Sequence, residues 1–381
     1  TVRVGDPLYG LRGDAEPAQG TITALFHFEG LKQIQVGEAH AGDIVGVAGL
    51  NDVLIGETLV DDLDRPALPF RPIDPPTIKM AFAVNDGPFA GLDGKKVTAR
   101  NIWERLEREG RANVSLQVAQ TDDSKIFHVT GRGGMQIAVL VEQMRREGYE
   151  VLVSRPEVLK HQDEKGKWLE PIEKVFLEVP KESLGDVMEA LANRKGNVTN
   201  MAPAGDRMTL EALVPTRGLI GFEVELLNHT RGEGIMSHLF HEYAPDTGEI
   251  PARRTGVLVS MEDGTVTAYA LDQLQERGRL MVVPGDKVYK GMIVGENARD
   301  NDLPVNPVRS KHLTNIRSQG DGKGIMLNAP MILSLERTLE YIAPDEYVEA
   351  TPTTLRLRKK ILDENARKRA EKKRATQLAE A

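Results

Sequence analysis

Short apolar runs separated by glycine open the chain and predict a small β-barrel. The runs lie at 20–28, 32–36, 43–48 and 54–60, and turn residues recur between them at roughly eight- to twelve-residue intervals, which is typical of all-β domains. A proline cluster then breaks regular structure, because each proline fixes φ and removes a backbone donor: Pro66, Pro69, Pro72, Pro75 and Pro76. We predict a barrel over 1–72, followed by a linker.

Beyond the linker, the apolar spacing alternates between strand and helix periods and predicts a ferredoxin-like domain over 76–160. In the helix expected at 98–109, Ile102, Trp103 and Leu106 share one face, and Gly110 is expected to end it. The other elements expected are strands at 77–84, 114–119, 126–130 and 150–154 and a helix at 135–147. Because four strands cannot bury their second face alone, two helices complete a β-α-β-β-α-β sandwich.

The same order of elements repeats over 168–243 with different residues. Strands are expected at 173–179, 197–202, 208–214 and 234–243, and helices at 184–193 and 219–228. The period of roughly 90 residues is too long for a solenoid unit, so the pattern predicts two whole ferredoxin-like domains in tandem. A charged turn, 161–166, separates them.

The C-terminal part, 244–381, is predicted to be a β-rich domain with a long basic loop and a terminal helix. Strands are expected at 256–260, 265–269 and 279–283. Residues 297–324 then contain hardly an apolar side chain, and so long a structureless stretch is either functional or disordered. Four basic side chains occur within it with no acid between them: Arg309, Lys311, His312 and Arg317.

Charge is unevenly distributed along the chain. With 49 Lys and Arg against 57 Asp and Glu, the net charge of −8 excludes a simple polycation. Residues 355–374 nevertheless hold three acids and ten bases, which are Arg356, Arg358, Lys359, Lys360, Arg367, Lys368, Arg369, Lys372, Lys373 and Arg374. This segment indicates a polyanionic partner, and a solvated terminal helix is the alternative.

Several classes of function are disfavoured. The chain has no cysteine and no Gly-x-x-x-x-Gly-Lys-Ser/Thr run for phosphate, and we found neither a Ser-His-Asp order nor a nucleophile elbow. His238 and His241 lie three apart on a predicted strand and therefore point to opposite faces, which argues against a metal site. No apolar stretch is long enough to cross a membrane, so we expect a cytoplasmic protein.

Particular motifs carry a family resemblance that covers essentially the whole chain. Residues 179–196 and Val214-Pro-Thr-Arg-Gly-Leu-Ile-Gly221 resemble the last ferredoxin-like domain of translational GTPases related to elongation factor G. More narrowly, Arg231-Gly-Glu-Gly-Ile-Met-Ser-His-Leu-Phe-His-Glu-Tyr243, residues 260–271 and Lys311-His-Leu-Thr-Asn-Ile-Arg317 are similar to the BipA, or TypA, family. The C-terminal part separates that family from elongation factor G and LepA.

The resemblance implies a GTPase, but the part that would bind GTP has no counterpart in these residues. Members of the family begin with a GTP-binding domain, whereas this chain begins where the β-barrel should start. We expect a truncated form or a proteolytic fragment. GTP and Mg²⁺ would then belong to the missing domain of the parent protein, with no catalytic residue, metal or cofactor in this chain.

The resemblance also implies partners: the rRNA of both ribosomal subunits at the factor-binding site, and the acceptor end of an A-site tRNA. The implied roles of this bacterial family are translation, ribosome assembly and stress adaptation, and we expect a monomer with no membrane contact. The loop would supply phosphate-neutralising cations and neutral hydrogen-bonding groups, namely Arg309, Lys311, His312, Thr314, Asn315, Arg317, Ser318 and Lys323. A disordered polar loop is the alternative.

Weaker candidates remain open. Arg253 and Arg254 could contact rRNA or could simply be a solvated surface pair. Gly131-Arg-Gly-Gly134 could offer backbone amides to a phosphate or could be only a tight strand-to-helix turn. A protein-interaction or regulatory-ligand scaffold without direct RNA binding is the alternative function, and an enzyme independent of the GTPase domain has no supporting motif.

Overall fold

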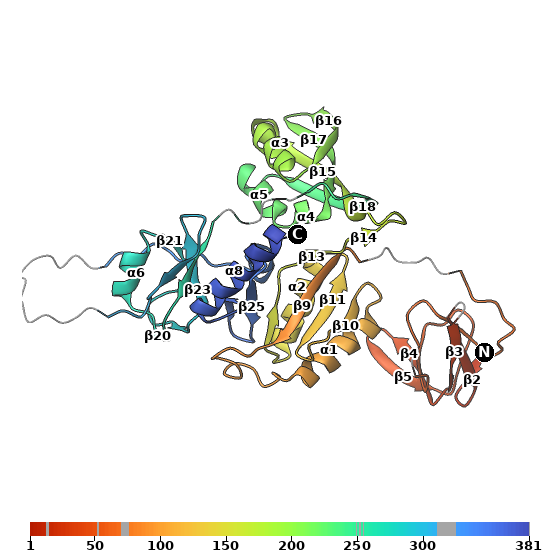
Figure 1. Ribbon diagram of the computed structural model, residues 1–381. Helices are drawn as coiled ribbons and strands as arrows, with labels where there is room; N and C mark the ends of the chain where they lie inside the picture. Colours follow the sequence, from red (N-terminus) through yellow and green to blue (C-terminus); the bar gives the residue numbers. More distant parts are fainter. Residues whose placement is uncertain are drawn as a thin grey trace, which may run out of the picture. The chain divides into compact units, whose positions relative to one another are not determined.

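The computed structural model describes residues 1–12, 15–51, 53–69, 76–248, 250, 253, 255–310 and 325–380. Contacts divide the chain into two compact units (Figure 1): Thr1–Asp74 with Glu107–Ser115, and Pro75–Leu106 with Leu116–Ala381. The mixed α+β, multidomain character predicted from the pattern is confirmed.

The smaller unit is built from short antiparallel strands, as predicted. They are β1 (Val2–Arg3), β2 (Pro7–Arg12), β3 (Ala15–Thr21), β4 (Ala24–Glu29), β5 (Lys32–Val36), β6 (Glu38–Ala39), β7 (Val45–Ala48) and β8 (Thr58–Val60). Leu8, Ile22 and Leu25 form its buried core. Among the residues described here, the strands pair as three separate sheets, β3-β2-β8, β5-β4-β7 and β1-β6, and do not close into one hydrogen-bonded barrel.

Beyond the linker, the first set of elements follows the predicted β-α-β-β-α-β order. It comprises β9 (Ile78–Val84), α1 (Ala99–Ala112), β10 (Gln117–Gln120), β11 (Ile126–Gly131), α2 (Gly134–Arg146) and β12 (Val151–Val153). The strand order β10-β11-β9-β12 is that of a ferredoxin-like sheet, and Ile102 and Leu140 bury the helices against it. The prediction that Gly110 ends the first helix was wrong. A glycine inside a helix costs only about 1 kcal/mol, and α1 continues past it with an Arg111–Glu107 ion pair.

The second set repeats this arrangement. It comprises β14 (His161–Gln162), β15 (Trp168–Pro180), α3 (Leu184–Asn193), β16 (Asn197–Ala204), β17 (Arg207–Pro215), α4 (Thr216–Leu219), α5 (Phe222–His229) and β18 (Ile235–Pro245), with strand order β16-β17-β15-β18. Val175, Leu191 and Phe222 form part of its core. The helix predicted over 219–228 is two helices, because Gly221 takes a φ of 74°, which ends α4 and starts α5.

The C-terminal strands extend the first ferredoxin-like sheet. They are β19 (Val257–Ser260), β21 (Gly278–Leu280), β23 (Met292–Asn297), β24 (Leu303–Val305), β25 (Glu346–Ala350) and β26 (Leu355–Lys359), and Val151–Val153 of β12 pairs antiparallel with β25. With β13 (Glu157–Val158), they complete an 11-stranded sheet. Residues 76–160 and 244–381, expected as separate domains, therefore share one sheet.

Two local predictions in this part were wrong. Of the strand expected at 265–269, only Thr265 is a strand residue, in β20 (Gly264–Thr265). Helix α6 (Ala268–Leu274) begins three residues later, because the Thr267 side chain caps it by accepting from the Ala270 amide at 3.1 Å. The stretch expected to be structureless holds β24, which runs parallel to β19 with Val305 buried. The remaining elements are the 3-10 helix η1 (Lys181–Ser183), β22 (Lys287–Val288), α7 (Leu335–Tyr341) and α8 (Glu364–Glu380).

Candidate nucleic-acid interface

Of the residues predicted to contact RNA, Arg309 and Arg253 belong to the described part of the chain. Arg309 is exposed, and its carbonyl accepts a hydrogen bond from the Thr267 hydroxyl at 2.6 Å, which fixes the backbone while the side chain stays in solvent. This geometry suits a phosphate contact. The other predicted residues lie outside the described residues: Lys311, His312, Thr314, Asn315, Arg317, Ser318, Lys323 and Arg254.

Arg253 has a different environment from the one expected of an RNA-contacting or solvated arginine. Its guanidinium forms two hydrogen bonds to the Glu346 carboxylate at 3.1 and 3.0 Å and lies 4.6 Å from the centre of the Tyr341 ring. The Arg253 side chain is 12% exposed, and Glu346 is fully buried. Because breaking a buried ion pair leaves an uncompensated charge, this pairing indicates a structural role.

The basic segment 355–374 divides into two physically different parts. Arg356, Arg358 and Lys359 lie on β26, with Arg358 and Lys359 buried and Arg356 mostly enclosed; their side chains are 3%, 2% and 12% exposed. Arg356 donates to Glu349 and to Asp93, each at 2.8 Å, and Arg358 donates to Asp86 at 3.0 Å. These cations neutralise acids of the same unit and are not available to a polyanion.

Lys359 is the most enclosed of these three cations. Its ammonium lies 2.8 Å from Glu346, 2.9 Å from Asp345 and 2.5 Å from Asp302. Burial alone would lower the pKa of Lys359, but the carboxylates of Glu346 and Asp345 outweigh burial and raise the pKa overall. The ammonium therefore stays charged in the folded protein.

Sequence reasoning missed the acids that neutralise β26, although the register carries a signal. In the β25–β26 pair, Glu346 lies opposite Lys359 and Glu349 lies opposite Arg356. Directly opposed opposite charges stabilise an antiparallel pair, so the two short charged runs are complementary. The Glu349 carboxylate also accepts from Tyr289 at 2.5 Å and from Asn85 at 3.1 Å, contacts from distant segments that no local pattern indicates.

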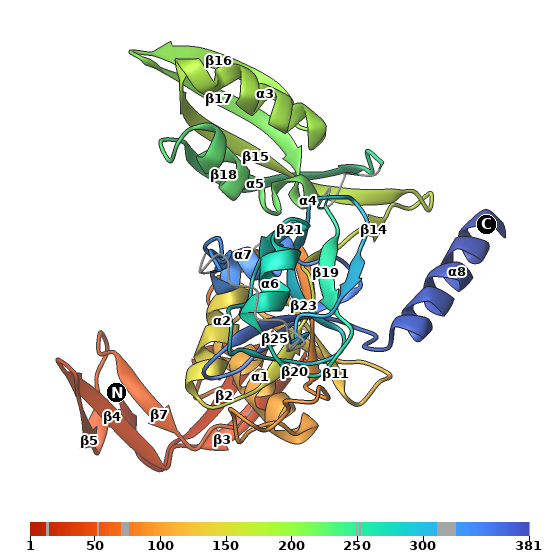
Figure 2. The ribbon, with the colours of Figure 1, turned by 90° about the vertical axis from the view of Figure 1, so that its left-hand side faces the viewer.

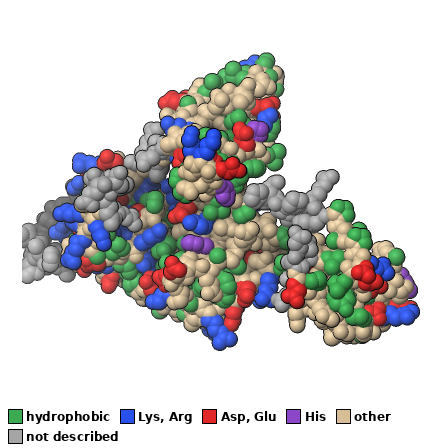
Figure 3. All heavy atoms as spheres, turned by 45° about the vertical axis from the view of Figure 1, so that its right-hand side comes forward, with side chains coloured by type: hydrophobic (Ala, Val, Ile, Leu, Met, Phe, Trp, Pro, Cys, Tyr) green, Lys and Arg blue, Asp and Glu red, His purple; other side chains and the backbone are tan. Residues whose placement is uncertain are grey.

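The remaining cations of the segment, from Arg367 onwards, lie on α8. Lys368, Arg369, Lys372 and Lys373 are exposed. On the face of the molecule drawn in Figure 3, by contrast, lysine and arginine are interspersed with aspartate and glutamate. The exposed cations of α8 therefore differ from the mixed charges on that face.

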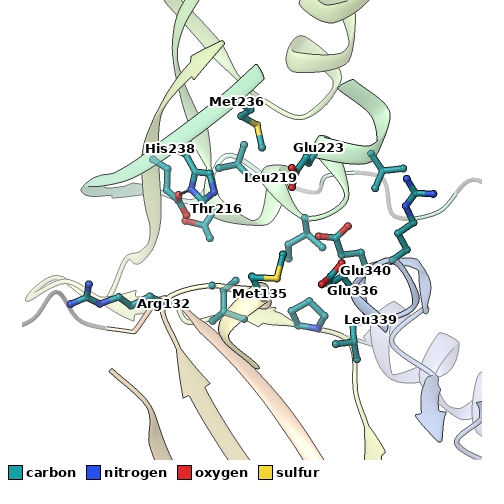
Figure 4. Close-up of a pocket in the computed structure, with 18 of the residues that line it drawn as sticks. Arg132, Met135, Thr216, Leu219, Glu223, Met236, His238, Glu336, Leu339 and Glu340 are labelled. Carbon is teal, nitrogen blue, oxygen red and sulfur yellow. Dashed lines mark hydrogen bonds and ion pairs between the residues drawn. The ribbon is translucent and has the colours of Figure 1, made fainter. Parts of the chain in front are cut away.

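A cavity of about 360 Å³ lies within the larger unit, where Gly131-Arg-Gly-Gly134 leads into α2 (Figure 4). Gly133 precedes α2 without a side-chain cap, and Arg132 and Met135 line the cavity with Leu219 and Met236. Three glutamates also line it: Glu223, Glu336 and Glu340. These acids oppose binding of a phosphate, so the geometry favours the tight-turn interpretation of the glycines.

His238 lies in the same cavity and pairs with Glu173. The hydrogen bond to Glu173 raises the pKa of His238 above its usual value, against the opposing effect of burial. Among the described residues, no group of three or more His, Cys, Asp or Glu side chains is placed to hold a metal ion. The pair thus acts as an ion pair that strengthens with protonation.

Comparison with known proteins gives three consecutive family matches. Residues 1–60 match the elongation factor Tu domain 2 model, 167–254 the elongation factor G C-terminus, and 255–364 the TypA/BipA C-terminal domain. None of the helices in the described ranges is long and apolar enough to cross a membrane.

Curated relatives match nearly the whole chain. A protein of Bacillus subtilis (strain 168) named "Large ribosomal subunit assembly factor BipA" is 45% identical over 378 residues, which are 99% of this chain and 62% of that protein. A protein of Synechocystis with the same name is 44% identical over 94% of this chain and 60% of that protein. A crystal structure of a Thermus thermophilus protein covers 65% of this chain and 52% of that chain with a TM-score of 0.41 and 17% identity. The chain spans about three fifths of the length of the curated relatives.

Proposed function

Because the chain belongs to the TypA/BipA family, we propose that it is the ribosome-binding part of a translational GTPase that acts in assembly of the large ribosomal subunit. The observation that carries this proposal is the 45% identity over 99% of the chain to a protein named as a large-subunit assembly factor. The setting of this function is the cytoplasm.

Chemically, the chain contributes contacts with RNA rather than catalysis. GTP and Mg²⁺ are assigned to residues of the parent protein outside this chain. Arg309 and the basic residues that follow it, Lys311 and Arg317 foremost, would neutralise phosphates near the acceptor end of an A-site tRNA. Roles in translation and stress adaptation would follow from occupying the factor site. Arg253 is left out of this proposed set, because Glu346 already neutralises it.

Sedimentation with purified ribosomal particles tests the proposal. The chain should pellet with large subunits, and its affinity should fall steeply with salt, because each phosphate contact releases counterions. Absence of binding at low salt would contradict the proposal. In parallel, a calorimetric titration with GTP and Mg²⁺ should show no binding to this chain. Micromolar binding of GTP to this chain would contradict the proposal that the nucleotide binds outside it.

A regulatory-ligand scaffold is the second candidate, and the cavity is the observation that favours it. Its volume of about 360 Å³ is within the range of small-molecule sites. Its lining includes apolar side chains, as such sites require: Leu219, Met236 and Met135. The substitution Met135→Trp would fill the cavity. If it changes the affinity for ribosomes, and if that affinity does not depend on salt, the second function is favoured over the first.

A further inference from the structure

Helix α8 begins at Glu364, the residue at which the match to the TypA/BipA C-terminal domain ends. The family match therefore assigns it no role. Residues 367–374 of this helix hold six cations and one acid, Glu371. Figure 2 shows α8 labelled as a single continuous helix at the end of the chain.

The base of α8 is fixed to the body of the larger unit. Asp363 caps the helix by accepting from the Ala366 amide at 2.9 Å, and its other oxygen accepts from the Lys290 ammonium, also at 2.9 Å. Arg367 donates to the carbonyls of Ile361 and Leu362 at 2.9 and 2.8 Å. Leu362 packs against the core that contains Tyr289. The first turn of α8 is thus fixed by the hydrogen bonds of Asp363 and Arg367 and by the packing of Leu362.

Beyond this base, the cations gather on one face. At 3.6 residues per turn, Lys368, Lys372, Arg369 and Lys373 fall within an arc of about 140°, and a rise of 1.5 Å per residue spreads them over about 7.5 Å. All four are exposed, and Ala366 and Ala370 lie on the more enclosed side. The geometry is a compact row of positive charge on a rigid support.

Most of these cations have no acid of their own. Lys368 pairs with Glu364 at 2.6 Å and remains 63% exposed. For Arg369, Lys372 and Lys373, no side-chain hydrogen bond or ion pair is found with the described residues. Three neighbouring charges without counter-ions in the described part of the chain are the arrangement that a polyanion neutralises.

We propose that the α8 face formed by Lys368, Arg369, Lys372 and Lys373 binds the phosphate backbone of a double-stranded RNA helix. Phosphates along a nucleic-acid strand carry closely spaced negative charge, which suits four cations within about 7.5 Å. Residues 364–380 contain no aromatic side chain on which an unpaired base could stack, so recognition is of backbone and shape. This inference rests on the proposed function, which makes ribosomal RNA the available polyanion.

The test compares two triple variants of the whole chain that each remove three positive charges. One is Arg369→Gln with Lys372→Gln and Lys373→Gln, since glutamine preserves helix propensity. The matched control is Lys165→Gln with Lys167→Gln and Lys181→Gln, three exposed lysines outside α8. Circular dichroism checks that both remain folded.

Binding is measured by fluorescence anisotropy to a 20-base-pair RNA duplex of arbitrary sequence, over a series of salt concentrations. We expect the α8 variant to lose about tenfold or more in affinity at 100 mM salt and to reduce the salt slope by up to about 2.7, from three contacts of roughly 0.9 each. The control should change little. Equal losses in both variants would overturn the inference, as would an unchanged α8 variant.

Parallel pelleting with large ribosomal subunits separates the two proposals. If the wild-type chain pellets but the α8 variant retains full duplex affinity, the inference fails and the proposed function stands. If the α8 variant loses duplex affinity as expected but the wild-type chain never pellets with subunits, the inference stands and the proposed function fails. Stronger binding to an acidic polypeptide such as polyglutamate than to the duplex would also overturn the choice of RNA.

Discussion

Strand β26 and helix α8 lie next to each other in the chain and are both rich in cations, yet they use their charges in opposite ways. On β26, Arg356, Arg358 and Lys359 are largely enclosed and matched by carboxylates at 2.5 to 3.0 Å. On α8, Arg369 and Lys372 are exposed without acidic partners among the described residues. Positive charge in a sequence therefore indicates a polyanionic partner only where the fold does not neutralise it.

The difference has a geometric cause. In the sheet, antiparallel pairing places Glu349 opposite Arg356 and Glu346 opposite Lys359, so two of the three cations meet an acid on the neighbouring strand. Arg358 lies opposite Tyr347 and pairs with Asp86 from another part of the unit. An isolated helix offers partners only three or four residues away, and on α8 Lys368 has one in Glu364. The other cations of the exposed face have none among the described residues and remain available to an outside ligand.

The largest expected effect comes from removing a β26 cation. Lys359→Ala leaves Glu346 buried with Arg253 as its remaining ion-pair partner, and loss of a buried ion-pair member destabilises a fold by about 3 to 5 kcal/mol. Urea unfolding, followed by Trp103 fluorescence in a Trp168→Phe background, measures the loss in the larger unit. The matched variant Lys372→Ala should change the free energy of unfolding by less than about 0.5 kcal/mol. Similar losses in both variants would remove the distinction between the two regions.

A smaller effect is expected at the junction between β26 and α8. Asp363→Ala removes the cap of α8 and the hydrogen bond from Lys290, so the first turn should fray and its amides should exchange several-fold faster with solvent. Asp363→Ser, which keeps a capping oxygen, should restore most of the protection. Unchanged exchange over 364–370 in Asp363→Ala would show that the base of α8 is held by other contacts.

The smallest effect concerns the pair formed by the exposed His238 and the buried Glu173. Since the pKa of His238 is raised in the folded state, its contribution to stability is complete below about pH 6.5 and is lost as pH rises through the folded-state pKa. An NMR titration should place the pKa of His238 above 6.5, and Glu173→Gln should lower it. Equal values in both proteins would mean that the pair does not form.

The sequence predicted the element order well where apolar periodicity was strong. In α2, Ile137, Leu140, Val141 and Met144 recur at helical spacing, and the helix lies within a residue of the prediction at each end. Prediction failed where a short-range signal opposed the pattern. At Thr267, a single capping hydroxyl starts a helix in a run rich in β-forming residues. At β24, three apolar residues within a mostly polar stretch become a strand by pairing with β19, and no local pattern indicates that long-range pairing.

For the candidate site, the sequence indicated the basic segment 355–374. It did not indicate that the cations of β26 are enclosed whereas those of α8 are exposed. The sequence shows ten cations between Leu355 and Arg374, whereas burial of the first three depends on Asp93, Asp86 and Asp302 from remote parts of the chain. Only the register of β25 against β26 was accessible, because two acids in one short run, Glu346 and Glu349, are followed by bases in the next. Arg253 shows the same limit, since its partner Glu346 lies 93 residues away.

Lysine acetylation with mass-spectrometric readout, in the free chain and with the RNA duplex bound, tests the distinction between β26 and α8 most directly. We predict that Lys372 and Lys373 react quickly in the free protein and are protected by the duplex, while Lys359 reacts slowly in both states because it is enclosed and its pKa is raised. Rapid modification of Lys359 in the native protein, or no protection of Lys372 and Lys373 by RNA, would contradict the account.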